Sequence, residues 1–425
     1  MFIRCIACCS RNRRLFLDEN GQVLDDVDAQ AGLPPHPTFD AVFTGESLSA
    51  AIARGQLFIW GDVHKALMPL MPHTYETAYT PPMCIPREIF GNSPVRHVAI
   101  GDVHVLVVTE AGRLYTGGYG GKGQLGLGSV GYIYEEATNP LELTHVAVAD
   151  VHVTGVAAGQ NSSCFVARDG SFFAFGENLR GECASGEHGF IWWPAQVPGF
   201  GAGAGEAKAV QASMHLHVAV LDADGFLHTA GCNSSGELGM GDREDRLLLS
   251  RVESGAMRMV ACGLRHTLAL DRLGCAWVCG SNKMDTLGMG AAGAFTDAVS
   301  VLQRVEGLSD VVFVTAGLDQ SMVVDSRGAV FAWGLYVARA SEPLWWPGAV
   351  DGPLQTERIP APQRFALPAR VGRYDLALHP LLALALAMGT HTRLGASSPL
   401  NTFSADTLRQ VAEACVVRDP AAQNQ

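Results

Sequence analysis

The stretch at residues 112–128, GRLYTGGYGGKGQLGLG, decides the fold, because the rest of the chain repeats it. Its first glycine suits a turn, since glycine adopts a positive φ at little energetic cost. The apolar residues that follow at alternate positions favour a β-strand. The glycines of the closing G-Q-L-G-x-G run allow the chain to return tightly. The stretch therefore predicts a turn, a strand and a glycine-rich loop.

The same spacing recurs along the chain with decreasing fidelity. Three further full copies begin at Gly170, Gly225 and Gly274, and the second of these has His228 in place of the aromatic residue. Weaker copies keep the strand but not the loop. The turn glycines are Gly21, Gly55, Gly112, Gly170, Gly225, Gly274 and Gly328, separated by 34, 57, 58, 55, 49 and 54 residues. Self-similarity at this period is typical of a propeller.

A second pattern precedes most of the turn glycines: a β-branched run, a small residue, then a polar residue that opens another apolar strand. The polar position holds His104, His217 and His266 in three units, and Ser162 and Gln320 in two others. Two strands before the turn, one after it and one behind the loop make a four-stranded antiparallel sheet. We therefore predict an all-β protein, a seven-bladed β-propeller of four-stranded antiparallel blades.

The combined pattern is G-x-x-H, an apolar strand, Gly, an aromatic residue, a second aromatic before Gly, then N-x-x-G-x-L-G-x-G. It resembles the regulator of chromosome condensation repeat family over residues 3–334. The resemblance implies the seven-bladed propeller and a hydrogen bond from His104 between blades. It also implies guanine-nucleotide exchange on a small GTPase as an alternative activity. No residue here matches the wedge by which the family's prototype acts, so no exchange site is carried over.

The organisation of the chain is expected to be a propeller over residues 1–375 and a short α-helical C-terminal extension over residues 376–425. Residues 364–367 are predicted to add the last strand of the seventh blade. The apolar run at residues 376–388 contains Pro380 and is too short to cross a bilayer, so it favours a packed helix.

Charge and cysteine content restrict the setting of the protein. The formal net charge of −12 argues against direct binding of nucleic acid, which needs clustered Lys and Arg. The 11 cysteines are an odd number at scattered apolar positions such as Cys262 and Cys279, which favours reduced core thiols. We therefore expect a cytoplasmic or nuclear protein that is not secreted and has no transmembrane segment.

Catalytic and metal-binding patterns are not found in the sequence. It contains no G-x-S-x-G, H-E-x-x-H or G-x-x-x-x-G-K-[ST] motif. Three Asp-Val-His triplets end at His64, His104 and His152, but they lie at different phases of the blade and are not expected to converge on a metal. We expect no enzymatic activity, no cofactor and no metal.

Two Trp-Trp-Pro tripeptides provide the candidate partner-binding residues, Trp192, Trp193, Trp345 and Trp346. Paired tryptophans in loops either pack against the propeller or form a binding hot spot. The first functional prediction is a non-enzymatic protein-binding scaffold or adaptor that uses propeller loops. The alternatives are a guanine-nucleotide exchange factor for a small GTPase and a substrate-recruiting adaptor in ubiquitin ligation, with a ligase component as partner.

Overall fold

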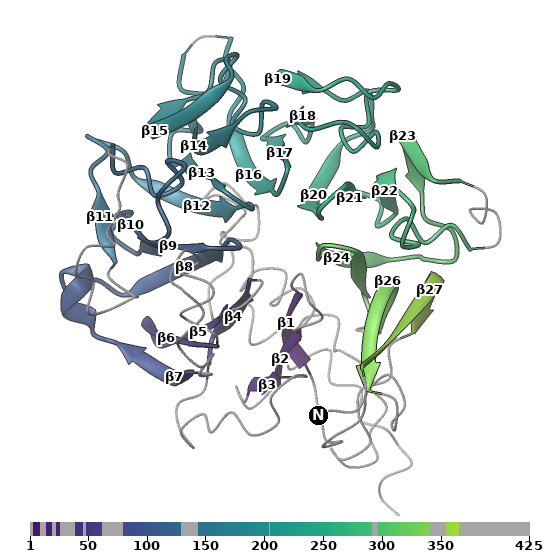
Figure 1. Cartoon of the computed structure of the whole chain (residues 1–425), viewed down its shortest axis with the longest axis horizontal. Helices are drawn as coiled ribbons and strands as arrows, with labels where there is room; N and C mark the ends of the chain where they lie inside the picture. Colours follow the sequence, from purple (N-terminus) through teal and green to yellow (C-terminus); the bar gives the residue numbers. More distant parts are fainter. Residues whose placement is uncertain are drawn as a thin grey trace, which may run out of the picture.

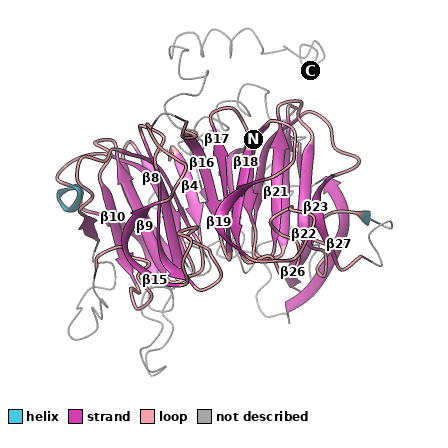
Figure 2. Ribbon diagram, turned by 90° about the horizontal axis from the view of Figure 1, so that it is seen from above, coloured by secondary structure: helices cyan, strands magenta, loops and turns pink. Residues whose placement is uncertain are grey.

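Seven antiparallel sheets follow one another around a ring in the computed structural model of the chain (Figure 1). Six sheets have four strands each, and the N-terminal sheet has three. In the view turned by 90°, the strands run between the two faces of the disc (Figure 2). The structure describes residues 3–8, 14–18, 23–25, 39–45, 48–61, 80–128, 143–203, 205–290, 296–327, 329–339 and 354–364.

The N-terminal sheet and the first three four-stranded sheets, here blades 1 to 3, take up the first half of the chain. The N-terminal sheet comprises β1 (Ile3–Cys8), β2 (Arg14–Asp18) and β3 (Val23–Asp25). Blade 1 comprises β4 (Ala41–Thr44), β5 (Leu48–Ala53), β6 (Gln56–Gly61) and β7 (Thr80–Ile85). Blade 2 comprises β8 (Val95–Ile100), β9 (His104–Thr109), β10 (Leu114–Gly118) and β11 (Thr144–Val146). Blade 3 comprises β12 (Val153–Ala158), β13 (Ser162–Ala167), β14 (Phe172–Asn178) and β15 (Gly189–Gln196).

Blades 4 to 6 follow in the same order of strands. Blade 4 comprises β16 (Ala209–Met214), β17 (His217–Asp222), β18 (Leu227–Gly231) and β19 (Arg246–Arg251). Blade 5 comprises β20 (Met257–Cys262), β21 (His266–Asp271), β22 (Ala276–Ser281) and β23 (Ala298–Arg304). Blade 6 comprises β24 (Val311–Ala316), β25 (Gln320–Asp325), β26 (Val330–Arg339) and β27 (Leu354–Arg364).

The first strand of each sheet lies next to the first strands of the two neighbouring sheets. β12 contacts β8 and β16, and β20 contacts β16 and β24. The N-terminal sheet fills the remaining position, because β1 contacts both β4 and β24. The N-terminal sheet therefore closes the ring.

The prediction of seven four-stranded blades is wrong, because only six sheets have four strands. The exception is the N-terminal sheet. Its turn glycine, Gly21, precedes the next one by only 34 residues. Much of that interval already belongs to β4 and β5 of blade 1. The stretch before β4 also contains three prolines, which cannot donate a ladder hydrogen bond. The short interval is thus the physical reason for the missing fourth strand.

The C-terminal predictions fare differently from one another. The last strand of the ring is β27, which ends at Arg364, so the predicted strand at residues 364–367 is placed too late. Residue Ile359 of β27 pairs with Gly334 of β26. The predicted helical extension at residues 376–425 lies outside the described residues. Within the described residues the structure has one short 3-10 helix, η1 (Arg87–Phe90), and no helix there is long and apolar enough to cross a membrane.

The turn glycines behave as the sequence predicts. Gly112 has a φ of +75° and Gly274 a φ of +82°, a region that side chains other than glycine rarely adopt. Gly112 also lies against the ring of His152, so that a Cβ at Gly112 would overlap the imidazole. Replacement of either glycine by valine therefore combines backbone strain with, at Gly112, a steric clash.

The hydrophobic core lies between neighbouring blades rather than inside any one sheet. One cluster joins Leu268 and Leu270 of blade 5 to Val323 and Trp333 of blade 6. Trp333 is fully buried and donates its indole N–H to the carbonyl of Thr286 over 2.8 Å. Burial of one such side chain stabilises the fold by about 2–3 kcal/mol. Each seam between blades thus acts as a small core.

Three seams between blades contain the same buried relay of hydrogen bonds. His104 Nε2 lies 2.8 Å from Ser163 Oγ on the next blade, and this hydroxyl donates to the carbonyl of Gln124. Because the hydroxyl proton goes to the carbonyl, the imidazole must be the donor to the hydroxyl. The other two relays are His217–Thr267–Glu237 and His266–Ser321–Thr286. The expected hydrogen bond from His104 between blades is confirmed.

Candidate partner-binding site

Trp192 and Trp193 lie in β15, the outer strand of blade 3, and not in a loop as the sequence suggested. Gly176 pairs with Ile191 and Ala174 pairs with Ala195. A single residue of β14 therefore faces the whole Trp192-Trp193-Pro194 tripeptide, which forms a bulge. Proline lacks a backbone N–H and is tolerated where the ladder is interrupted. The bulge turns the tryptophans out of the regular alternation of the strand.

The glycine-rich loop of blade 2 docks onto this bulge. The N–H of Gly128 donates to the carbonyl of Trp192 over 2.9 Å. The ring of Trp193 covers Gly128 so closely that a Cβ there would overlap the indole. Gly128 has a φ of +75°. Trp193 therefore packs on the neighbouring blade, which is one of the two roles that the sequence left open.

The same part of blade 3 nevertheless exposes apolar side chains to solvent. The exposed fraction is 58% for Trp193, 43% for Phe190 and 50% for Leu179. The rings of Phe190 and Trp192 lie 5.9 Å apart in a tilted arrangement. We call these four residues, Leu179, Phe190, Trp192 and Trp193, the tryptophan patch. Large aromatic side chains on a rigid strand are typical of residues that anchor a protein partner.

Ion pairs flank the tryptophan patch. Lys122 Nζ lies 2.8 Å from a carboxylate oxygen of Glu177, and Asn161 donates to the same oxygen over 2.9 Å. Glu177 pairs with Phe190 across the two strands. Arg180 Nε lies 3.1 Å from Asp245 Oδ2, in the loop of the next blade. An apolar centre with a charged margin resembles the anatomy of protein–protein interfaces.

Equivalent bulges occur on the outer strands of the next two blades, and the sequence analysis missed them. The exposed fraction is 51% for Leu248 in β19 and 47% for Val301 in β23. Gly186 donates its N–H to the carbonyl of Leu247, and Gly241 donates to Ser300, as Gly128 does to Trp192. The regular distance from each turn glycine to its outer strand is the signal that points to these positions.

Trp345 and Trp346 lie outside the described residues, so the predicted relation between the two tryptophan pairs stays a prediction. The same holds for His64 of the first Asp-Val-His triplet. His104 belongs to a buried relay, whereas His152 contacts Arg168 over 2.8 Å at the opposite end of the blades. Within the described ranges, no three His, Cys, Asp or Glu side chains are grouped as metal ligands. The structure therefore does not bring the triplets together.

The buried histidines are held in their neutral form. Burial lowers the pKa of His104 and of His217 from the ordinary value of 6.5 to about 3. Burial also lowers the pKa of His266 to about 4. A neutral, enclosed imidazole that donates to a hydroxyl stabilises a seam. It is not accessible to a substrate proton, so these three residues do not form a catalytic centre.

Comparisons with known proteins agree with the repeat pattern. The sequence profile of the regulator of chromosome condensation (RCC1) repeat matches residues 111–166 and 224–270. The chain is 31% identical over 244 residues to the ultraviolet-B receptor UVR8 of Arabidopsis thaliana, a match that covers 56% of this chain and 53% of that protein. It is 32% identical over 176 residues to the mouse secretion-regulating guanine nucleotide exchange factor, covering 40% of this chain and 37% of that protein. The matches thus span about half of these relatives or less.

The fold has solved counterparts. The structure of Prp20p from Saccharomyces cerevisiae, described with its binding properties to Gsp1p and histones, superimposes with a TM-score of 0.63 at 18% identity. The match covers 80% of each of the two chains. At this identity the likeness concerns the fold alone.

Proposed function

Because the chain belongs to the regulator of chromosome condensation repeat family, we propose that it is a non-enzymatic protein-binding scaffold whose tryptophan patch holds a protein partner. The observation that carries this proposal is the exposure of Trp193, 58%, on a strand that both its own blade and the loop of blade 2 hold in place. An anchor residue that is already ordered loses little conformational entropy when a partner binds.

The chemistry of the patch defines the partner. Leu179, Phe190 and Trp193 present apolar surface, so the partner contributes an apolar face. The flanking pairs Lys122–Glu177 and Arg180–Asp245 carry both signs of charge, so polar groups of the partner surround that face. Charges at such a margin govern specificity and association rate more than affinity.

The test is affinity capture with mass spectrometry, followed by titration of the purified partner. We compare the intact chain with a Phe190→Ala/Trp193→Ala double variant. The matched control is Leu273→Ala, which removes an apolar side chain that is 86% exposed on the β21–β22 hairpin, away from the patch. The double variant is expected to weaken binding of the partner by about 30-fold or more, as loss of interface anchors commonly does.

Two outcomes decide the proposal. A partner that binds Leu273→Ala normally and loses affinity for the double variant supports the patch as its site. Equal affinity for all three proteins, with unchanged thermal midpoints, contradicts it and reduces the tryptophans to packing residues.

A second candidate function rests on the 32% identity to the mouse secretion-regulating guanine nucleotide exchange factor. Exchange activity on a small GTPase predicts faster release of labelled GDP when the chain is added. The measurement is release from a panel of purified small GTPases. Release rates that stay at the uncatalysed value throughout the panel remove this candidate and leave the scaffold function.

A further inference from the structure

The third strand of each blade carries one large side chain near its start, and in three blades a phenylalanine from the preceding connection covers it. Phe39 meets Phe58 in blade 1, Phe90 meets Tyr115 in blade 2, and Phe200 meets His228 in blade 4. The ring centroids are 5.4, 5.2 and 5.2 Å apart, with interplanar angles of 85°, 87° and 82°. Edge-to-face contact of this kind is the favoured geometry for aromatic pairs.

Two further blades use aliphatic covers at the same place. Val148 and Val151 pack in one cluster with Phe173 of blade 3. Leu308 packs in one cluster with Phe331 of blade 6, and 94% of its surface is buried if its exposed fraction of 6% is subtracted from the whole. A side chain from the connection that enters the blade thus covers the third strand in five blades.

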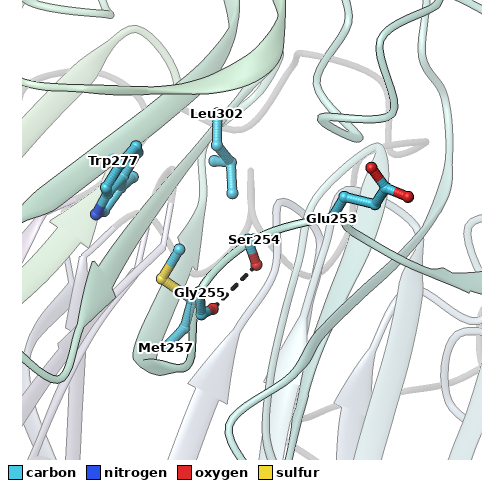
Figure 3. Close-up of a pocket in the computed structure, with 6 residues that line it drawn as sticks. All are labelled: Glu253, Ser254, Gly255, Met257, Trp277 and Leu302. Carbon is cyan, nitrogen blue, oxygen red and sulfur yellow. Dashed lines mark hydrogen bonds between the residues drawn. The ribbon is translucent and has the colours of Figure 1, made fainter.

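Blade 5 lacks this cover. Its third strand carries Trp277, and the connection that enters the blade runs only through the residues Val-Glu-Ser-Gly-Ala at 252–256. Among the described residues, no aromatic ring packs on Trp277. In place of a cover the structure has a pocket of about 510 Å³ lined by Glu253, Ser254, Gly255, Met257, Trp277 and Leu302 (Figure 3).

The floor of the pocket is fixed by contacts within blade 5. Trp277 donates its indole N–H to Asp271 Oδ2 over 2.9 Å, so its polar atom is satisfied and its apolar surface remains for contact. Met257 is buried, and Trp277 and Leu302 pack partly buried against the same cluster. Ser254 donates its hydroxyl to the neighbouring carbonyl of Gly255, as Figure 3 shows. The pocket is thus mainly an apolar site.

A carboxylate stands beside this apolar floor. Glu253 is exposed and makes no ion pair with any described residue. Figure 3 shows its carboxylate directed away from the pocket floor, at the outer side of the connection. A group that binds in the pocket therefore meets a negative charge next to it, and the formal net charge of the whole chain is also negative, −12. Both favour a positively charged ligand.

We propose that this pocket, the blade 5 pocket, binds a segment of a partner protein that inserts one aromatic side chain onto Trp277 and places a Lys or Arg beside Glu253. The aromatic side chain takes the position that Phe39, Phe90 and Phe200 hold in blades 1, 2 and 4. The basic residue pairs with the Glu253 carboxylate. This site is separate from the tryptophan patch, which lies on blade 3.

The variant that tests the proposal is Gly255→Phe, which supplies the missing cover from the chain itself. The φ of Gly255 lies outside the left-handed region, and a Cβ there meets no heavy atom within 4 Å. The substitution is therefore compatible with folding, and contact of the new ring with Trp277 is expected to raise the thermal midpoint or leave it unchanged. Glu253→Lys is the second variant, because it reverses the nearby charge at an exposed position.

The experiment selects random peptides displayed on phage against the intact protein, then measures the affinity of synthetic copies for each variant. Selected peptides are expected to combine an aromatic residue with a nearby Lys or Arg. Gly255→Phe is expected to weaken their binding by at least about 10-fold, as loss of an anchor contact does. Glu253→Lys is expected to weaken it several-fold, and less so at high salt, because salt screens exposed charges.

The contrary outcomes are equally clear. Peptides without an aromatic residue, or peptides that bind Gly255→Phe as tightly as the intact chain, overturn the proposal. So does a selection that yields no binding peptide. Binding that survives Glu253→Lys unchanged removes the basic residue from the proposal. Phe190→Ala/Trp193→Ala serves as the control that must bind normally, which separates this site from the proposed scaffold function.

Discussion

Two kinds of seam join the blades, and they differ at one pair of positions. Between blades 4 and 5, His217 on one side faces Thr267 on the other. Between blades 3 and 4, the equivalent positions hold Ser162 and Val218, and both are buried. Between blades 1 and 2, they hold Leu48 and Val105, which belong to one apolar cluster.

The comparison teaches that each imidazole occurs with a hydroxyl opposite it. His104, His217 and His266 each meet Ser or Thr, whereas neither seam without histidine has a hydroxyl at the partner position. A buried donor without an acceptor destabilises the fold by about 1–3 kcal/mol, whereas an apolar pair of similar shape is nearly neutral. The two positions are therefore coupled across the seam.

The largest expected effect is that of Thr267→Val. The variant keeps the shape of the side chain but leaves the His217 donor and the carbonyl of Glu237 without their partner. We expect the free energy of unfolding to fall by about 3 kcal/mol. Chemical denaturation measures it. Thr267→Ser is the control that retains the hydroxyl, and a His217→Leu/Thr267→Val double variant should recover part of the loss.

The pH dependence of stability comes next. The folded-state pKa of His217, about 3, lies below the unfolded value of 6.5, so the unfolded chain binds more protons between these pH values. Stability therefore falls as the pH drops below about 6.5, on the order of 2 kcal/mol for this histidine at pH 5. Unfolding at pH 7 and pH 5 measures it. A His217→Leu variant with the same pH dependence as the intact chain contradicts the assignment.

Trp193→Ala tests the packing role of the tryptophan patch. The variant uncovers Gly128 and removes a contact between blades 2 and 3, so we expect a loss of about 1 kcal/mol in the free energy of unfolding. The value is small because more than half of the side chain is already exposed. Val301→Ala, at the equivalent bulge of blade 5, should lose less. A loss above that of Thr267→Val contradicts this reading.

The smallest effect is expected for Val218→Thr, which introduces the hydroxyl into an apolar seam. By analogy with Ser163 and Thr267, the new hydroxyl can donate to the carbonyl of Glu182, at the equivalent place in the loop of blade 3. We expect a change within about 1 kcal/mol. A loss of several kcal/mol shows that the apolar seam cannot accept a hydroxyl, and that the two seam types differ in more than this pair.

Much of the fold follows from the sequence because the repeat makes the strand order local. The positive φ at Gly112 and Gly274, the placement of β1 at Ile3–Cys8 and the hydrogen bond of His104 between blades were all predicted correctly. The fourth strand of the N-terminal sheet was predicted and is absent from the described residues. Spacing alone gives no warning there, since the strand motif around Gly21 is intact.

Less of the candidate site was predictable. The tripeptide at Trp192 and Trp193 was recognised, but its place in a strand depends on how Gly128 of another blade docks on it. Leu248 and Val301 have no distinctive sequence neighbours and emerge only from strand register. The blade 5 pocket was not foreseen, because it arises where a cover is missing, and only comparison of the blades in space reveals that.

The sequence by itself determined the blade: glycine turns, alternating apolar strands and the glycine-rich loop are all encoded within one repeat, where a few backbone angles decide the outcome. The tertiary structure decided what happens between repeats. Whether a histidine meets a hydroxyl, whether Trp193 covers a glycine and whether Trp277 lies under a phenylalanine depend on residues about 30 to 60 positions apart. These contacts form only when neighbouring sheets pack, because packing excludes water from the seams and makes each unmatched group costly.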